Sequence, residues 1–171
     1  MNMSDLVFTV FETCLGWIGI VRSSQGLRKI ILAQKSKEDV VRQVEEYYSS
    51  AQICDTDSFG DLAQRLRRYF QGEEVHFPDV MDFAGASRFQ QRVWQAARTI
   101  PYGETRSYAW VAAQSGMPKA ARAVGQALGR NPLLIVVPCH RVVSSDGTLG
   151  GFSAGLEMKK HLLRMEKSGT G

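Results

Sequence analysis

The sequence contains few cysteines. There are three, at positions 14, 54 and 139, and they form no CxxC pair. An odd number of scattered cysteines argues against a disulfide framework and favours a reducing compartment. The missing CxxC pair argues against a structural zinc site. Cys14, Cys54 and His76 make a partial set of metal ligands, but small buried cysteines are the commoner case. We therefore expect no metal and no other cofactor.

Signals for membranes and for export are also missing. No apolar run approaches the ~20 residues that a transmembrane helix needs. Residues 1–17 lack the basic region followed by an apolar region that a secretory signal requires. We expect a cytoplasmic protein with no membrane partner. With 171 residues, 44% of them hydrophobic, the chain can form one domain with a sizeable core or two small domains.

Acidic residues are scarce in the second half of the chain. Residues 83–171 contain 12 Lys and Arg but only 4 Asp and Glu, a net charge of +8, whereas residues 1–82 carry a net charge of −4. A basic half joined to an acidic half indicates that the basic half binds a polyanion. The alternative is a basic surface without such a partner.

The first half of the chain shows the pattern of a mixed α/β domain. Three short β-branched and aromatic segments predict an antiparallel meander over residues 6–13, 16–23 and 27–34. Helical spacing of apolar residues predicts two helices, one starting at Ser36 and one over 59–72 that ends at Gly72. Residues 74–83 are strand-like but are broken by Pro78. Small residues and the change in charge place the domain boundary near residue 84, which gives domains 1–84 and 85–171.

The second half is mostly helical. The pattern predicts a helix over 87–100 capped by Ser87, a turn over 101–104, and helices over 107–116 and 119–131. An apolar strand over 133–143, a turn, a Gly-rich loop over 149–155 and a final helix over 156–167 follow. Two short helices joined by a Gly-containing turn in a basic half indicate a helix-turn-helix, although many helical hairpins look alike.

The second of these two helices would face DNA. Its outer face carries Arg122 and Gln126 among small residues, which include Ala121 and Gly125. Small residues allow a helix to lie close to a phosphate backbone or in a narrow groove. Such a helix has few side chains that can distinguish base edges, which suits a protein that does not recognise sequence.

A cysteine, a histidine and an arginine stand together in the apolar stretch "IVVPCHRVV". A cysteine reacts as the thiolate and needs a base to remove its proton. His140 is adjacent to Cys139, and a tight turn at Pro138 could bring both side chains to one pocket. Glu166 on the last helix is a candidate to orient His140. The alternative is that Cys139 is a core thiol and His140 a core histidine.

Motifs in the second half resemble one known family. "PCHRVV", preceded by "GRNP" and followed by "GGFSAGLEMKKHLLRME", is similar to the active-site region of O6-alkylguanine-DNA alkyltransferases, also called methylated-DNA–protein-cysteine methyltransferases. "FQQRVWQAARTIPYGETRSYAWVA" and "PKAARAVGQAL" extend the resemblance over residues 87–167. The first half is similar only in its order of strands and helices. The resemblance implies a ribonuclease H-like α/β domain followed by a winged helix-turn-helix domain.

The resemblance also implies catalytic roles. Cys139 would accept the alkyl group irreversibly, so that each molecule acts once. His140 would act as a base through a bound water, and Glu166 would polarise His140. Asn131 would brace the turn that carries the cysteine, and Tyr108 would donate a proton to the departing guanine.

Further residues would bind the substrate base. The backbone carbonyls of Cys139 and Val142 would accept from its exocyclic amine, Ser153 would donate to O6, and Lys159 would lie near the same pocket. Phe152 stands where the family commonly has a tyrosine, so its ring can stack on the base but a hydroxyl contact is lost.

The implied partner is double-stranded DNA that carries O6-alkylguanine, and O4-alkylthymine is a second candidate lesion. A reactive atom inside the base stack requires the nucleotide to be flipped out. Arg122 would fill the gap in the duplex, with Ala121 and Gly125 close to the backbone. The protein is expected to act as a monomer.

Two other functions stay open at the level of the sequence. A non-catalytic DNA-binding regulator would use the helix-turn-helix alone. A cysteine hydrolase would use Cys139 and His140 with turnover, and it would need neither Arg122 nor the basic half.

Overall fold

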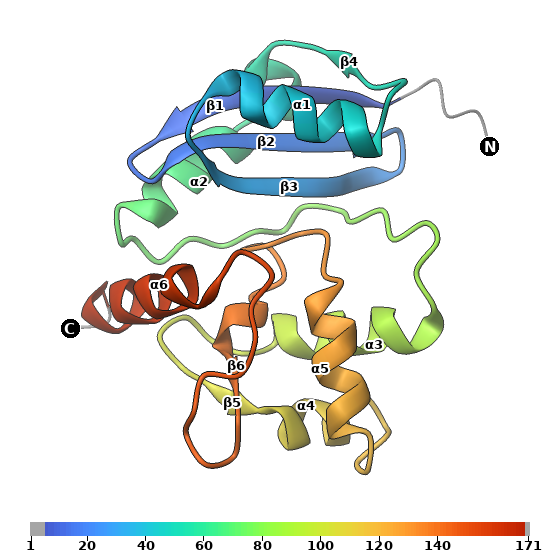
Figure 1. Ribbon diagram of the computed structural model, residues 1–171, viewed down its shortest axis with the longest axis vertical. Coiled ribbons are helices and arrows are strands. Elements are labelled where there is room, and N and C mark those ends of the chain that lie inside the picture. The colour runs from blue at the N-terminus through green and yellow to red at the C-terminus, as the bar shows by residue number, and fades with distance from the viewer. Residues whose placement is uncertain (1–5, 170–171) are drawn as a thin grey trace. The chain divides into compact units, whose positions relative to one another are not determined.

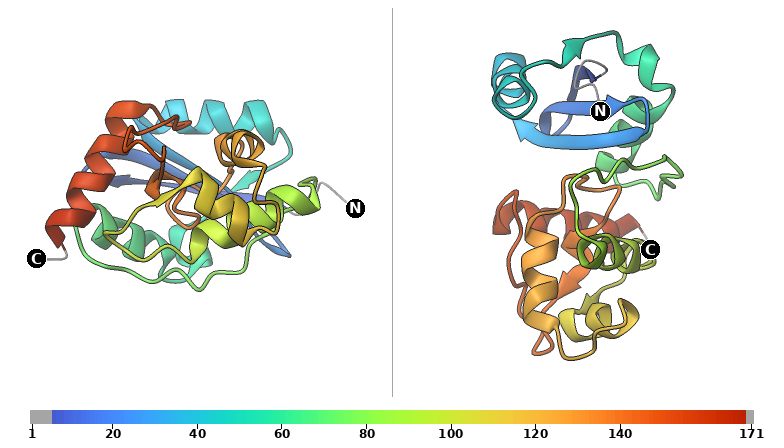
Figure 2. Two further views of the ribbon diagram at one scale, coloured as in Figure 1. Left: turned by 90° about the horizontal axis from the view of Figure 1, so that it is seen from below. Right: turned by 90° about the vertical axis from the view of Figure 1, so that its right-hand side faces the viewer.

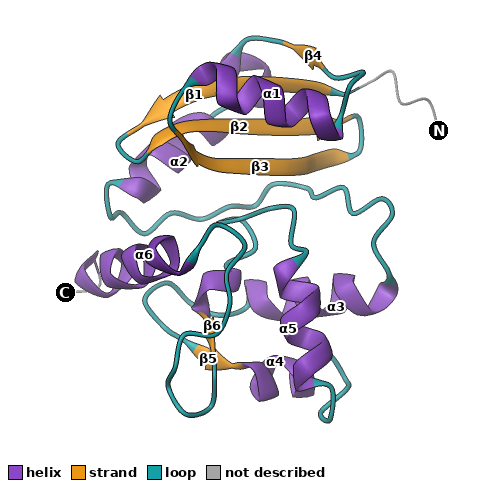
Figure 3. Ribbon diagram, in the orientation of Figure 1, coloured by secondary structure: helices purple, strands orange, loops and turns teal. Residues whose placement is uncertain are grey.

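The β-branched and aromatic segments at the start of the chain form the antiparallel meander that their composition predicts. In the computed structural model, which describes residues 6–169, the strands are β1 (Val7–Thr13), β2 (Gly16–Ser23) and β3 (Gly26–Gln34). A two-residue strand, β4 (Gln52–Ile53), pairs in parallel with β1, so the sheet order is β3-β2-β1-β4 (Figures 1 and 3). Gly16 turns β1 into β2 with a φ of 116°, and a Cβ there would lie 2.7 Å from the Gln34 carbonyl oxygen, so this position requires glycine.

Two helices accompany this sheet. The first, α1 (Lys37–Tyr47), begins at the predicted Ser36, whose side chain accepts from the Asp39 backbone N–H. The second, α2 (Leu62–Phe70), begins three residues later than predicted because a short 3-10 turn, η2 (Thr56–Phe59), precedes it. One hydrophobic cluster joins α1 to the sheet and contains Leu6, Phe8, Val21, Ile31, Val40 and Val44.

The strand-like segment 74–83 forms no strand. It makes an isolated bridge between Met81 and Leu27. Pro78 has no N–H to donate to a ladder, and the next residue, Asp79, accepts two hydrogen bonds from Arg65 at 2.7 and 2.8 Å. The segment is therefore held by these side-chain bonds and by two backbone hydrogen bonds with Leu27, from Leu27 N to Val80 O at 2.9 Å and from Asp82 N to Leu27 O at 2.8 Å.

The second unit begins with a well-capped helix. In α3 (Arg88–Arg98), Ser87 and Gln90 form a capping box. A turn with Gly103 at a φ of 76° leads to β5 (Arg106–Ser107), and α4 (Tyr108–Gln114) and α5 (Ala121–Gly129) follow. Trp94 of α3 donates its indole N–H to the Ala127 carbonyl of α5 at 2.9 Å. Figure 2 shows α3, α4 and α5 grouped together, as a helix-turn-helix requires.

The predicted strand over 133–143 is wrong for most of its length. Residues 133–137 form a turn in which Val137 N donates to Leu133 O at 2.8 Å and Ile135 has a φ of 76°. A 3-10 turn, η3 (Cys139–Arg141), follows, and only β6 (Val142–Val143) pairs, in parallel with β5. Residues 133–140 are all buried. A run buried on every side carries no alternation, so its pattern cannot distinguish a strand from a compact turn.

The last helix of the described residues is α6 (Leu156–Gly169). The contacts divide the chain into two compact units, Met1–Phe83 and Ala84–Gly171, and the boundary expected from the sequence lies one residue further on. Within residues 6–169, no helix combines the length and apolar character that a membrane crossing demands.

Candidate functional site

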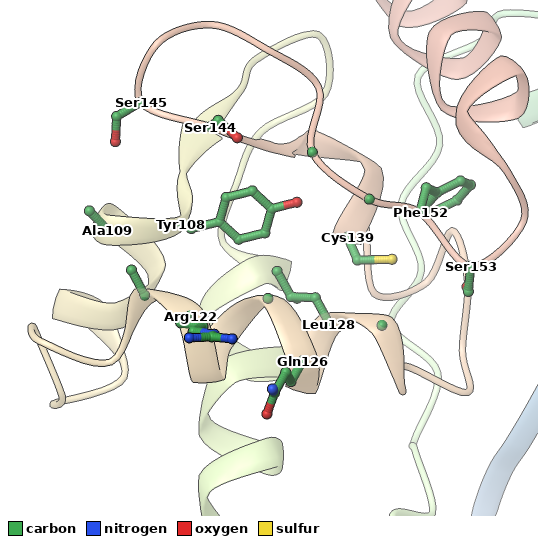
Figure 4. Close-up of a pocket in the computed structure, with 15 residues that line it drawn as sticks. Tyr108, Ala109, Arg122, Gln126, Leu128, Cys139, Ser144, Ser145, Phe152 and Ser153 are labelled. Carbon is green, nitrogen blue, oxygen red and sulfur yellow. The ribbon is translucent and has the colours of Figure 1, made fainter.

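The 3-10 turn η3 places Cys139 at the wall of a pocket. The pocket has a volume of about 700 Å³ and lies entirely within the second unit (Figure 4). Three elements surround it: the start of α4, one face of α5 and the loop after β6. The residues that line it are Tyr108, Ala109, Ala121, Arg122, Gly125, Gln126, Leu128, Gly129, Cys139, Ser144, Ser145, Gly150, Gly151, Phe152 and Ser153.

Asn131 braces the turn that carries the cysteine. Its Nδ2 donates to Val137 O at 2.9 Å and to Cys139 Sγ at 3.2 Å, and its Oδ1 accepts from Leu133 N at 2.9 Å. Asn131 is buried, so these contacts replace water at both ends of the turn. One amide thereby fixes the backbone before the cysteine and contacts the sulfur itself.

The thiol of Cys139 is protonated at neutral pH. Burial raises its pKa to about 11, although the Asn131 amide, the Lys159 ammonium and the backbone N–H groups of Cys139 and His140 act in the opposite direction. The same groups would stabilise a thiolate once it formed. A nucleophilic reaction at this sulfur therefore needs a nearby base to take its proton.

Glu166 of α6 forms hydrogen bonds with the two residues that follow Cys139, which are His140 and Arg141. Its Oε1 lies 2.7 Å from His140 Nε2. Arg141 donates to the same carboxylate through Nε to Oε2 and through Nη2 to Oε1, both at 2.9 Å. The backbone N–H of Gly103 adds a contact to Oε2 at 3.2 Å. The side chains of His140 and Glu166 are fully buried.

These contacts and burial determine the protonation states of Glu166 and His140. Burial alone would raise the pKa of Glu166, but the hydrogen bonds from His140 and Arg141 outweigh burial and bring the pKa to about 2. Burial lowers the pKa of His140, and the hydrogen bond to Glu166 opposes this shift without reversing it. A carboxylate thus faces a neutral imidazole. Because the carboxylate only accepts, Nε2 carries the proton, and Nδ1 is the nitrogen that can take up another one.

Tyr108 and the Gly-rich loop form the opposite side of the pocket. The Tyr108 hydroxyl points towards the side where Cys139 lies (Figure 4). Burial raises the pKa of Tyr108, and a backbone hydrogen bond with Gly151 partly offsets that effect. The Phe152 ring meets the His140 ring edge-on, with 6.3 Å between the ring centroids, and Ser153 is exposed at the rim.

Two residues expected to bind substrate lie outside the pocket lining. Lys159 is fully buried, and its ammonium donates to the Val142 carbonyl at 2.6 Å. That carbonyl, which the family resemblance assigns to the exocyclic amine of the base, is thus already bound by Lys159.

The expected DNA-contact residues share the exposed side of α5. Arg122 is exposed, and Ala121 and Gly125 are half-buried. A Cβ at Gly125 would lie 3.7 Å from the Tyr108 ring, which is ordinary contact. Arg122 lines the pocket together with Cys139, so one face of the helix-turn-helix carries both the basic side chain and the entrance to the thiol.

Sequence reasoning missed Arg141 as part of the site. Its guanidinium binds Glu166, donates to Ile100 O at 2.7 Å, and lies 5.7 Å from the centroid of the Tyr102 ring. The signal was its position next to His140 in an apolar stretch, because a buried charge needs a partner. As for metals, nowhere in residues 6–169 do three or more His, Cys, Asp or Glu side chains gather as a metal ion would need.

Comparison with known proteins agrees with this geometry. Residues 6–80 match the family described as "6-O-methylguanine DNA methyltransferase, ribonuclease-like domain", and residues 88–168 match "6-O-methylguanine DNA methyltransferase, DNA binding domain". The fold and the site thus define a two-domain protein with a ribonuclease-like α/β domain and a DNA-binding domain that holds a buried cysteine.

Named relatives extend this match along most of the chain. The methylated-DNA–protein-cysteine methyltransferase of Mycobacterium tuberculosis is 47% identical over 75% of this chain and 79% of its own length. The constitutive enzyme of Bacillus subtilis is 40% identical over 94% of both chains. The crystal structure of Mycobacterium tuberculosis OGT in complex with DNA superposes with a TM-score of 0.79 at 38% identity, covering 95% of this chain and 94% of that one. The chain belongs to the methylated-DNA–protein-cysteine methyltransferase family.

Proposed function

We propose that this protein repairs DNA by transferring the alkyl group of O6-alkylguanine to Cys139. The observation that carries the proposal is the position of Cys139, a buried thiol at the wall of a pocket. Asn131 donates a hydrogen bond to its sulfur, and the next residue, His140, is paired with Glu166. Direct DNA binding by the relative of known structure supports DNA as the partner.

The reaction balances without a cofactor. The Cys139 thiol gives its proton to Nδ1 of His140 through a water molecule, and Glu166 stabilises the imidazolium that forms. The sulfur attacks the alkyl carbon, the bond between that carbon and O6 breaks, and the electron pair leaves with the guanine. Tyr108 supplies a proton to the departing base, and the proton held by His140 then returns through solvent to the tyrosinate, so that both side chains end as they began. The products are a thioether on Cys139 and an intact guanine.

The product explains why each molecule would act once. A thioether is not reversed by thiol exchange, which requires a disulfide, and the proposed mechanism leaves no group that could cleave it. A cysteine hydrolase would instead release its intermediate and turn over.

The same proposal assigns the face of α5 to duplex DNA. Arg122 would enter the duplex where the lesion is flipped out, while Ala121 and Gly125 allow the backbone to come close. Ser153 and Phe152 would contact the extruded base at the pocket rim. We further propose that the protein acts as a monomer in the cytoplasm and that O4-alkylthymine is a second substrate.

Intact-mass analysis tests this function directly. The protein is mixed with a duplex that carries one O6-methylguanine, and the expected result is a mass increase of one methylene, located on Cys139 by peptide mapping, with a plateau at one equivalent. Cys139→Ser should bind DNA without gaining mass. Cys14→Ser, which removes an exposed cysteine, is the matched control and should react normally. Binding without any mass change in the unaltered protein would identify a regulator, and turnover beyond one equivalent would identify a hydrolase.

A further inference from the structure

A buried ammonium is solvated by the loop after β6. Lys159 of α6 is fully buried, and its Nζ donates to the backbone carbonyls of Val142 at 2.6 Å, of Gly151 at 3.1 Å and of Leu149. An ammonium has three protons to donate, so all three are used. Removing a cation from water is costly unless other dipoles replace the water. Here the two ends of the loop over residues 142–151 do so, and Lys159 holds them together.

The carbonyls held by Lys159 belong to the backbone that covers Tyr108. Gly150 has a φ of 68°, and a Cβ there would overlap the Tyr108 hydroxyl and approach ring atoms Cε2 and Cζ to 2.8 and 2.9 Å. Gly151 makes a backbone hydrogen bond with the Tyr108 side chain. The Lys159 ammonium itself lies 5.9 Å from the centroid of the Tyr108 ring. Lysine, loop backbone and phenol are therefore in continuous contact.

We propose that Lys159 is a positioning residue for Tyr108, because its ammonium holds the backbone of residues 149–151 against the phenol and so aims the hydroxyl into the pocket. This inference rests on the proposed function, in which Tyr108 is the proton donor. It replaces a direct role of Lys159 in substrate binding, since the ammonium is bonded to loop carbonyls and is absent from the pocket lining.

A double-mutant cycle separates positioning from general damage. Lys159→Gln keeps two donors for the carbonyls but removes the charge, and it should slow alkylation of Cys139 by free O6-benzylguanine more than about tenfold, part of the contribution of a general acid. Tyr108→Phe should slow it as well. In the Tyr108→Phe background, Lys159→Gln should add less than about threefold, because the group that it positions is already gone and only the effect of the ammonium on the Cys139 sulfur is left. Equal slowing by Lys159→Gln in both backgrounds, or no slowing at all, would overturn the proposal.

Two glycines of the same loop give an independent and matched test. Gly147 and Gly150 both have a positive φ, 84° and 68°, so alanine strains both positions. A Cβ at Gly147 meets nothing within 4 Å, whereas one at Gly150 meets Tyr108. Gly150→Ala should slow alkylation more than about tenfold and Gly147→Ala less than about twofold. Equal rates for the two variants would contradict the proposal, even where Lys159→Gln does not fold.

The unaltered protein distinguishes the two levels of the argument. If it gains no mass from O6-benzylguanine or from alkylated DNA, the proposed function fails and the positioning role fails with it. If the unaltered protein reacts, and Lys159→Gln and Gly150→Ala each react as fast as it does, the function stands and only the role of Lys159 is refuted.

Discussion

Glu166→Gln is the sharpest test of the electrostatics of the site. The pKa of Glu166 is about 2 in the folded protein and 4.5 in the unfolded chain. A carboxyl whose pKa is lowered by folding contributes stability that is fully present above pH 4.5 and is lost as the pH falls towards 2. This difference in pKa corresponds to about 3 kcal/mol at pH 7 and about 1 kcal/mol at pH 3.

The free energy of unfolding of Glu166→Gln should therefore differ from that of the unaltered protein by an amount that depends on pH. At pH 7, glutamine leaves the Arg141 guanidinium without its carboxylate, and breaking a buried ion pair typically costs about 3–5 kcal/mol. As the pH falls to 3, the unaltered protein loses its own Glu166 contribution while the glutamine does not titrate. The gap between the two proteins should narrow by about 2 kcal/mol.

Urea unfolding at pH 7, 5 and 3 measures this gap. Trp94 and Trp110 belong to the second unit and Trp17 to the first, so a Trp17→Phe background restricts the fluorescence signal to the unit that holds Glu166. Glu157→Gln is the control, because Glu157 lies on the same helix with its side chain 87% exposed, and its free energy of unfolding should stay close to that of the unaltered protein at every pH. A gap for Glu166→Gln that does not change with pH would refute the ionised carboxylate.

Three further substitutions test other parts of the molecule. Arg122→Ala should strongly reduce alkyl transfer from duplex DNA and spare transfer from free O6-benzylguanine, because only the duplex requires base flipping; equal losses on both substrates would reject insertion. Asn131→Ala leaves Leu133 N buried without its acceptor and removes one of the two hydrogen bonds to Val137 O, so urea unfolding should show a loss of roughly 1–3 kcal/mol together with slower transfer. Ser87→Ala removes a capping box and should cost about 1 kcal/mol in the same unfolding assay while the transfer rate stays unchanged; a slower rate would mean that α3 takes part in the site.

Local patterns predict most of the elements of this fold. Ser36 and Ser87 mark the starts of helices because their side chains accept from backbone N–H groups of the first turn, and β-branched and aromatic composition predicts β1 to β3. The loss of the strand over 74–83 follows from Pro78, which was visible in the sequence. The sequence does not show which contacts hold this segment, namely the Arg65–Asp79 pair and the backbone bonds with Leu27.

Long-range contacts limit what the sequence reveals about the site. The family resemblance supplies Cys139, His140 and Glu166, and the structure brings the last two to 2.7 Å. The resemblance does not give the bond from Arg141 to Glu166, which joins residues 25 positions apart. It also places Lys159 near the substrate, whereas burial turns its ammonium towards backbone carbonyls. Both outcomes depend on how α6 packs, and periodicity within one segment carries no information about that.

The turn before the cysteine has a consequence for how this protein can evolve. Ile135 is β-branched and sits at a φ of 76°, a conformation that costs on the order of 1–3 kcal/mol and persists only where the surroundings enforce it. The surroundings are the core itself, since Leu133, Val136 and Val137 are all buried. The reactive residue is thus attached to the hydrophobic core and not to a separate loop. Substitutions that loosen the core also move the nucleophile. The stability and the reactivity of this domain therefore change together.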